Sequence, residues 1–157
     1  MRKIITKHLF FICLSSLLMS FSFDSNRGII FQTDGWGHVT KAAHESGKPI
    51  FIFIGTKKCG LSCRMEELMK NNNKVAGFYN SHFICTRMDP TEVITNFRLT
   101  NWGISQVPVM LFMNSKRKII YRINGYQDAE KLIEAGNNAT NLIDLQKDTH
   151  LYSVKNK

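Results

Sequence analysis

The chain has 157 residues, 43% of them hydrophobic, and a formal net charge of +9 at pH 7. This length is enough for a targeting segment followed by one domain with a hydrophobic core, but not by two. The 4 cysteines are too few for a disulfide-rich mini-protein, and the basic residues are not interleaved with aromatic ones as in a nucleic-acid-binding groove. We therefore expect one globular domain that binds no nucleic acid.

Residues 1–22 have the three parts of a secretory signal peptide. A basic start is followed by an apolar run over 9–19 and then by small residues around a cleavable position. The run is shorter than the roughly 20 residues that span a bilayer, which argues against the alternative, an uncleaved membrane anchor. We predict a mature chain that begins near Phe23, keeps no stable membrane anchor and is periplasmic or extracellular.

The elements that follow alternate between helices and strands. The run Ile50–Ile54 is continuously apolar, which is typical of a strand buried on both faces of a sheet. In chain order, the pattern predicts an edge strand over 28–31, a helix over 38–45, a strand over 50–54, helices over 64–70 and 74–80, a strand over 82–88, a helix over 91–101, a hairpin of strands over 107–113 and 118–123, and a helix over 128–135.

This order predicts an α/β fold of three layers, with a mixed central sheet flanked by helices. We assign residues 23–140 to the domain and residues 141–157 to a polar C-terminal tail. No regular element is predicted from Gly136 onward.

Two cysteines stand where the strand 50–54 gives way to the next helix, in the segment Cys59-Gly60-Leu61-Ser62-Cys63. The start of a helix directs free N–H groups and the positive end of the helix dipole at a sulfur placed there, which favours the thiolate. The ammonium groups of Lys57 and Lys58 are expected to favour it further. We assign Lys57, Lys58 and Ser62 as residues that modulate the site. We therefore predict thiol–disulfide chemistry with a lowered pKa for Cys59.

The chain resembles the thioredoxin superfamily, in particular its exported bacterial thioredoxin-like branch. The resemblance rests on landmarks in the right order: Trp36 before a helix, Lys48-Pro49 before an apolar strand, the cysteine pair, Met65-Glu66, Phe83 and Asp89 around a strand, Gly103 to Pro108 before a hairpin, and Gly125-Tyr126. It implies a thioredoxin-like fold and an exchange reaction with protein thiols and disulfides.

The resemblance also assigns residues. It implies that Cys59 is the nucleophile and that Pro108 is a cis-proline facing it. Val107 would then offer backbone hydrogen bonds to an extended substrate peptide. An unidentified redox partner would recycle the site, and no cofactor is expected.

The second thiol of the site is left open by the sequence. Aligned without gaps, the family pattern places Ser62 at its second cysteine, with Cys63 one position further, whereas one inserted residue would keep Cys63 as the resolving thiol. A disulfide needs Cβ atoms about 3.5–4.5 Å apart, so Cys63 can bridge to Cys59 only if the first helical turn is distorted. We favour Cys63 as the resolving thiol. The alternatives are a monothiol site with Ser62 facing Cys59, and a permanent or inert pair.

Two other functions use the same residues. The protein could deliver copper through Cys59 and Cys63, since soft thiolates favour Cu(I), although no histidine stands where a third ligand is expected. It could also be a non-catalytic adaptor whose groove only binds peptide. Cys85, within a strand, is expected to be a small core residue.

Overall fold

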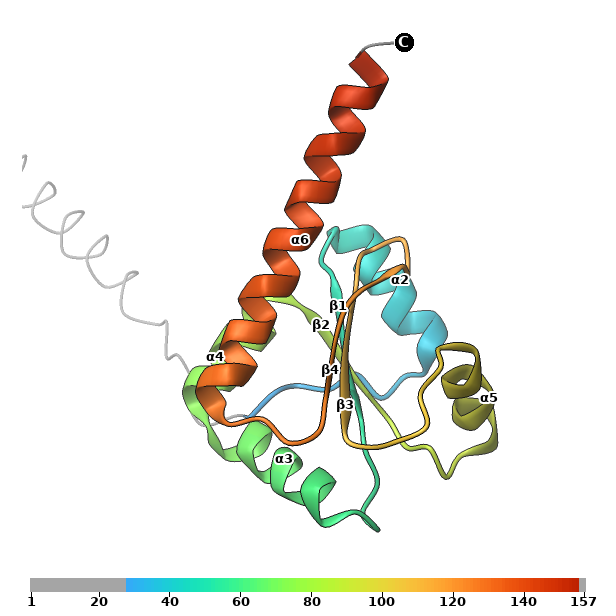
Figure 1. The fold of residues 1–157 in the computed structure, drawn as a ribbon, viewed down its shortest axis with the longest axis vertical. Helices are drawn as coiled ribbons and strands as arrows, with labels where there is room; N and C mark the ends of the chain where they lie inside the picture. The colour runs from blue at the N-terminus through green and yellow to red at the C-terminus, as the bar shows by residue number, and fades with distance from the viewer. Residues whose placement is uncertain (1–27, 156–157) are drawn as a thin grey trace, which may run out of the picture.

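The computed structural model describes residues 28–155, with side-chain surroundings as far as residue 146, so the predicted signal peptide over 1–22 lies outside it. Within this range the elements are α2 (Trp36–Ser46), β1 (Ile50–Ile54), α3 (Gly60–Asn71), α4 (Asn73–His82), β2 (Ile84–Met88), α5 (Val93–Asn101), β3 (Val109–Met113), β4 (Ile119–Asn124) and α6 (Ala129–Lys155) (Figure 1). From α2 to β4, the predicted order and type are confirmed, with ends that differ by a few residues.

The four described strands form one mixed sheet in the order β2-β1-β3-β4. β1 is parallel to β2, whereas β3 is antiparallel to both of its neighbours, β1 and β4. In the pairing of β1 with β3, Ile54 lies opposite Val109. The residues that follow Ile54 and those that precede Val109 therefore leave the sheet at the same edge.

Helices cover both faces of the sheet (Figure 1). Because successive side chains of a strand point to opposite faces, Phe51 and Phe53 of β1 pack with residues of α3, α4 and α6. Ile50, Ile52 and Ile54 pack on the other face with residues of α2 and α5. The predicted three-layer α/β architecture with a mixed central sheet is confirmed.

An aromatic cluster fills the core beneath α4 and α6. The ring of Phe51 lies 4.4 Å from that of Tyr79 and 5.3 Å from that of Phe112, centroid to centroid. The Tyr79 hydroxyl donates a hydrogen bond of 2.7 Å to the carbonyl of Leu132 in α6. The Tyr79 hydroxyl is therefore paired although its ring is buried, and this hydrogen bond joins α4 to α6.

The predicted edge strand over 28–31 is wrong. The bridge from this part of the chain to the sheet lies one residue later, between Gln32 and Thr86 of β2. Within the segment 28–31, two N–H groups bond to helices: the Ile29 N–H donates to the Met69 carbonyl (2.9 Å) and the Ile30 N–H to the Asn80 side chain (2.9 Å). The segment does bury an apolar side chain, Ile29, but its N–H groups donate hydrogen bonds to residues of α3 and α4 rather than to a neighbouring strand.

The prediction of no regular element beyond 136 is also wrong, because α6 continues through the region assigned to a polar tail. Gly136 suggested a helix end, yet a Cβ at this position would lie 2.4 Å from the Phe78 ring. The glycine thus permits close packing of α6 on α4. Ala139 and Ile143 are buried one and two turns later, and the end of α6 projects beyond the sheet layers (Figure 1).

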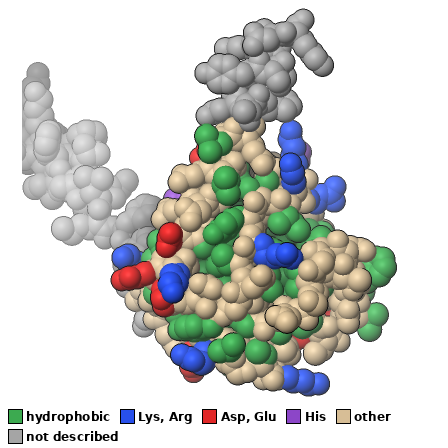
Figure 2. Space-filling model, viewed as in Figure 1, with side chains coloured by type: hydrophobic (Ala, Val, Ile, Leu, Met, Phe, Trp, Pro, Cys, Tyr) green, Lys and Arg blue, Asp and Glu red, His purple; other side chains and the backbone are tan. Residues whose placement is uncertain are grey.

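Some hydrophobic side chains remain on the surface. Among the described residues, Val93, Ile94 and Phe97 of α5 are 86%, 76% and 73% exposed, and hydrophobic atoms are visible over this helix at the right edge of Figure 2.

Between residues 28 and 155, none of the helices combines the length and apolar character that crossing a bilayer requires.

Candidate active site

Cys59 lies at the beginning of α3, where the chain turns out of β1. It is the N-cap residue, with an extended backbone (φ −112°, ψ 116°), and its carbonyl accepts the N–H of Cys63 at 3.0 Å. The turn before it is closed by a hydrogen bond of 3.1 Å from the Cys59 N–H to the Thr56 carbonyl. This places a half-buried sulfur at the positive end of the helix, as the sequence predicted.

Val107 and Pro108 lie opposite Cys59, because the β1–β3 register brings these two segments together. The Cys59 thiol contacts the Val107 carbonyl at 3.7 Å. The Val107–Pro108 peptide bond is cis, and the Pro108 carbonyl accepts the Gly125 N–H at 2.8 Å, which fixes the loop. Among the described residues, the Val107 N–H has no hydrogen-bond partner, so this donor is free.

Ser62 is fully buried beneath Cys59. A Cβ added to Gly55 would lie 3.1 Å from the Ser62 Cβ and 2.5 Å from the Phe53 ring, so α3 sits directly on the end of β1 here. The Ser62 hydroxyl has no hydrogen-bond partner among the described residues. The sulfur of Cys59 is therefore the acceptor to which this hydroxyl can donate a hydrogen bond.

The pKa of Cys59 is lowered, chiefly by a hydrogen bond from the Ser62 side chain. The backbone N–H groups of Ser62 and Leu61 at the helix start lower it further, while partial desolvation of the sulfur opposes them. Lys57 and Lys58 are not among the causes. The predicted lowering is thus present, but its main source is Ser62 rather than the two lysines that the sequence analysis expected to favour the thiolate.

Replacing Ser62 with alanine is expected to raise the pKa of Cys59, because the thiolate loses its side-chain donor while the helix start remains. Iodoacetamide alkylation followed against pH in a Cys63→Ser, Cys85→Ala background isolates this thiol. The rate should rise at a lower pH than for a free cysteine, and Ser62→Ala should move the curve to higher pH. An unchanged curve would show that Ser62 does not stabilise the thiolate.

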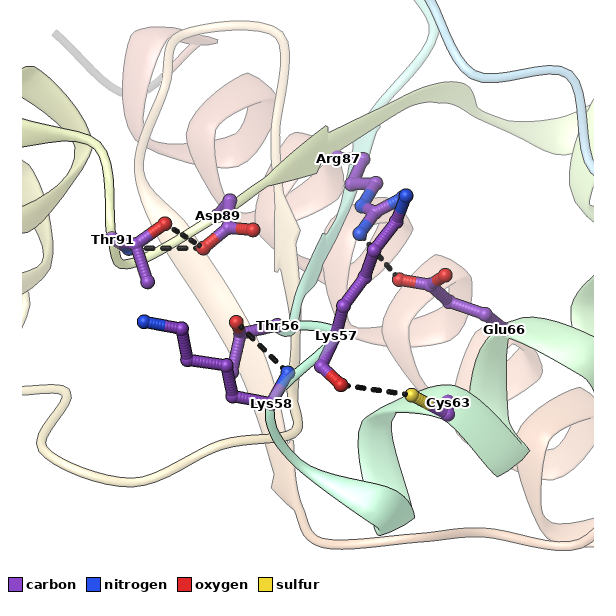
Figure 3. Close-up of polar contacts among 8 residues, drawn as sticks. All are labelled: Thr56, Lys57, Lys58, Cys63, Glu66, Arg87, Asp89 and Thr91. Atoms are coloured by element: carbon purple, nitrogen blue, oxygen red, sulfur yellow. Dashed lines mark hydrogen bonds and ion pairs between the residues drawn. The ribbon is translucent and has the colours of Figure 1, made fainter.

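Cys63 lies on a different side of α3 from Ser62. Its thiol donates to the Lys57 carbonyl at 3.5 Å, and the three described cysteines are all free (Figure 3). The structure therefore brings Cys59 together with Ser62, Val107 and Pro108, and holds Cys63 next to this group against the preceding loop.

Charged residues that the sequence did not assign to the site flank it (Figure 3). Glu66, one turn after Cys63, lies 2.6 Å from Arg87 of β2, in an ion pair without the alignment of a hydrogen bond. Asp89 accepts the Thr91 N–H at 2.9 Å and the Thr91 hydroxyl at 2.8 Å, and these bonds lower the pKa of its carboxyl. One sequence signal pointed to this pair: Arg87 is the charged residue within the strand β2.

Cys85 and the metal alternative can be placed as well. Cys85 is 2% exposed, and burial raises the pKa of its thiol to about 12, so it is a core residue rather than a nucleophile. In the part of the chain that the structure describes, no group of three histidine, cysteine or acidic side chains is gathered as a metal site would need.

The comparisons with known proteins agree with this arrangement. The model of the thioredoxin-like domain family matches residues 36–140. A solution structure from Bacteroides thetaiotaomicron, assigned as a disulphide-isomerase, has 26% sequence identity and a TM-score of 0.65 over 73% of this chain and 94% of that chain. The oxidised C-terminal domain of Neisseria meningitidis DsbD has 18% identity and a TM-score of 0.59 over 66% and 90% of the two chains, and shows the fold alone.

A curated protein of Archaeoglobus fulgidus, uncharacterised in function, is 32% identical over 60 residues, which are 38% of this chain and 47% of that protein. The match thus spans about half the length of this relative. The family model, in contrast, covers well over half of the present chain, and its range includes both the cysteine segment and the cis-proline loop. The chain therefore belongs to the thioredoxin-like family.

Proposed function

We propose that the protein is a thiol–disulfide oxidoreductase that acts on protein disulfides through Cys59. The observation that carries this proposal is the pairing of a thiol of lowered pKa with a buried, otherwise unpartnered Ser62 hydroxyl, beside the free Val107 N–H. A thiolate is the form that attacks disulfides, and an unpaired backbone group beside it can align an extended peptide. The activity attributed to the Bacteroides relative supports the same reaction class.

The first step uses Cys59 alone. Its thiolate attacks one sulfur of a substrate disulfide, a bond forms between the two sulfurs, and the other substrate sulfur leaves as a thiolate that takes a proton from water. The product is a mixed disulfide on Cys59. Once the sulfur is no longer charged, the Ser62 hydroxyl loses its anionic partner.

In the second step we assign Cys63 as the resolving thiol. Its thiol leaves the Lys57 carbonyl, loses its proton to solvent and attacks the Cys59 sulfur of the mixed disulfide. The Cys59–Cys63 bond forms, the substrate leaves as a dithiol, and an external dithiol partner then reduces the pair. Because these sulfurs are four residues apart, the first turn of α3 must distort to bring them within bonding distance.

We propose that this chemistry takes place after export. The support is the signal-like pattern of residues 1–22, together with two accessible thiols that would meet disulfide-bonded proteins in an oxidising compartment. The substrates are then exported proteins, and the redox partner is a protein that supplies reducing equivalents there.

Reduction of insulin by the protein corresponding to residues 23–157 tests the reaction. With dithiothreitol as the terminal reductant, the wild-type protein is expected to accelerate precipitation of the insulin B chain well above the reductant alone. Cys59→Ser should return the rate to that of the reductant. A wild-type rate equal to this blank would refute the proposed function, as would full activity in Cys59→Ser.

A further inference from the structure

Two lysines directly precede Cys59, and the exchange reaction does not account for them. Both Lys57 and Lys58 are exposed, and neither contributes to the lowered pKa of Cys59. Figure 3 shows their side chains diverging, with Lys57 directed toward the Glu66–Arg87 pair and Lys58 toward Asp89. Within residues 28–146, neither lysine forms an ion pair.

A third cation, Arg64, lies on α3 itself, five residues after Cys59. The guanidinium of Arg64 is 4.7 Å from the centre of the Tyr126 ring. Tyr126 follows Gly125, whose N–H is bonded to the Pro108 carbonyl at 2.8 Å. Exposed positive charge is therefore present in the loop before Cys59, at Lys57 and Lys58, and on the first turns of α3, at Arg64.

Glu66 and Asp89, the two acids drawn near these lysines in Figure 3, have other partners. Glu66 forms an ion pair with Arg87. The carboxylate of Asp89 accepts hydrogen bonds from the Thr91 N–H and hydroxyl. Lys58 acts on Asp89 through its charge and forms no ion pair with it. Among these residues, four cations therefore face two carboxylates. At the lower edge of Figure 2, separate groups of lysine or arginine atoms project from the surface, and the left group lies next to acidic atoms.

We propose that this basic rim, formed by Lys57, Lys58 and Arg64, selects protein disulfides whose attacked cysteine is flanked by acidic residues. The proposal rests on the proposed function and names its substrate class. Complementary charge around a binding site mainly accelerates encounter and fixes orientation. Leu61, 46% exposed beside the cations, adds an apolar contact for the same peptide.

Three synthetic peptides test the proposal. They share one intramolecular disulfide and differ only in the two residues flanking one cysteine, which are glutamate, glutamine or lysine. An exposed ion pair changes binding by up to about fivefold, so kcat/KM is expected to be about tenfold higher for the glutamate peptide than for the lysine peptide at low ionic strength. The ratio should approach one near 1 M salt, where the Debye length is about 3 Å.

Charge reversal separates the rim from the net charge of the protein. Lys57→Glu/Lys58→Glu should abolish or invert the peptide preference, whereas Lys116→Glu/Lys118→Glu, an equal change in the exposed β3–β4 turn, should keep it. Comparing peptides within one variant cancels any change in the reactivity of Cys59. Equal kcat/KM for the three peptides, or an unchanged preference in the Lys57/Lys58 variant, would overturn the proposal. If the wild-type protein reduced none of the peptides, the proposed function itself would fail.

Discussion

Replacing Cys63 with serine is expected to lower steady-state reduction of a protein disulfide by about 100-fold or more, while Cys59 still forms a mixed disulfide. The first step needs only the Cys59 thiolate and its Ser62 donor, which this variant keeps. The second step loses its internal thiol, so release depends on slow attack from solution. Mass spectrometry of the quenched reaction should show substrate covalently attached to Cys59.

The control for this experiment is Cys85→Ala, which removes a thiol that is 2% exposed and has no access to substrate. It should turn over at the wild-type rate. If Cys63→Ser also did so, with no accumulated adduct, Cys63 would have no resolving role. The site would then work as a monothiol, with Ser62 holding the position that faces Cys59.

Replacing Phe51 with alanine is expected to lower the free energy of unfolding by about 3–5 kcal/mol. The Phe51 side chain is fully buried in the middle strand pair, and its ring contacts those of Tyr79, Phe83 and Phe112. Truncation removes buried apolar surface and leaves a cavity that rigid β1 cannot close. Urea denaturation followed by circular dichroism measures the loss as a lower midpoint.

The same substitution at a surface site provides the matched control. Phe97 of α5 is 73% exposed, so Phe97→Ala should change the free energy of unfolding by less than about 0.5 kcal/mol. If the two variants lost equal stability, the aromatic cluster would not be the core that the structure shows. Should Phe51→Ala prevent folding altogether, Phe51→Leu, which keeps most of the volume, should fold with a smaller loss.

The sequence was sufficient for those features that local chemistry determines. Continuous apolar residues over Ile50–Ile54 identified a strand buried on both faces, and the structure confirms it. The position of Cys59 at a strand-to-helix junction follows from the same change of periodicity. Because the start of a helix stabilises a thiolate through its own backbone, the lowered pKa of Cys59 could also be predicted without a tertiary structure.

The role of a glycine and the partners of backbone hydrogen bonds could not be predicted from the sequence. Gly136 has the sequence signature of a helix end, yet α6 continues through it. A glycine stands here because a side chain would collide with Phe78. The segment 28–31 has the composition of a strand, yet Ile29 and Ile30 bond to residues of α3 and α4. In both cases the deciding partner lies about 40 or more residues away in the chain.

The sequence by itself determined the three-layer class and the place of two thiols after a buried strand, since these depend on residue type and on local periodicity. Only the tertiary structure decided which side chain lies beneath Cys59. That choice depends on how α3 is rotated against β1, and burial of Met65 and Met69 together with the close approach at Gly55 sets this rotation. It turns Ser62 inward under the sulfur and leaves Cys63 against the Lys57 carbonyl.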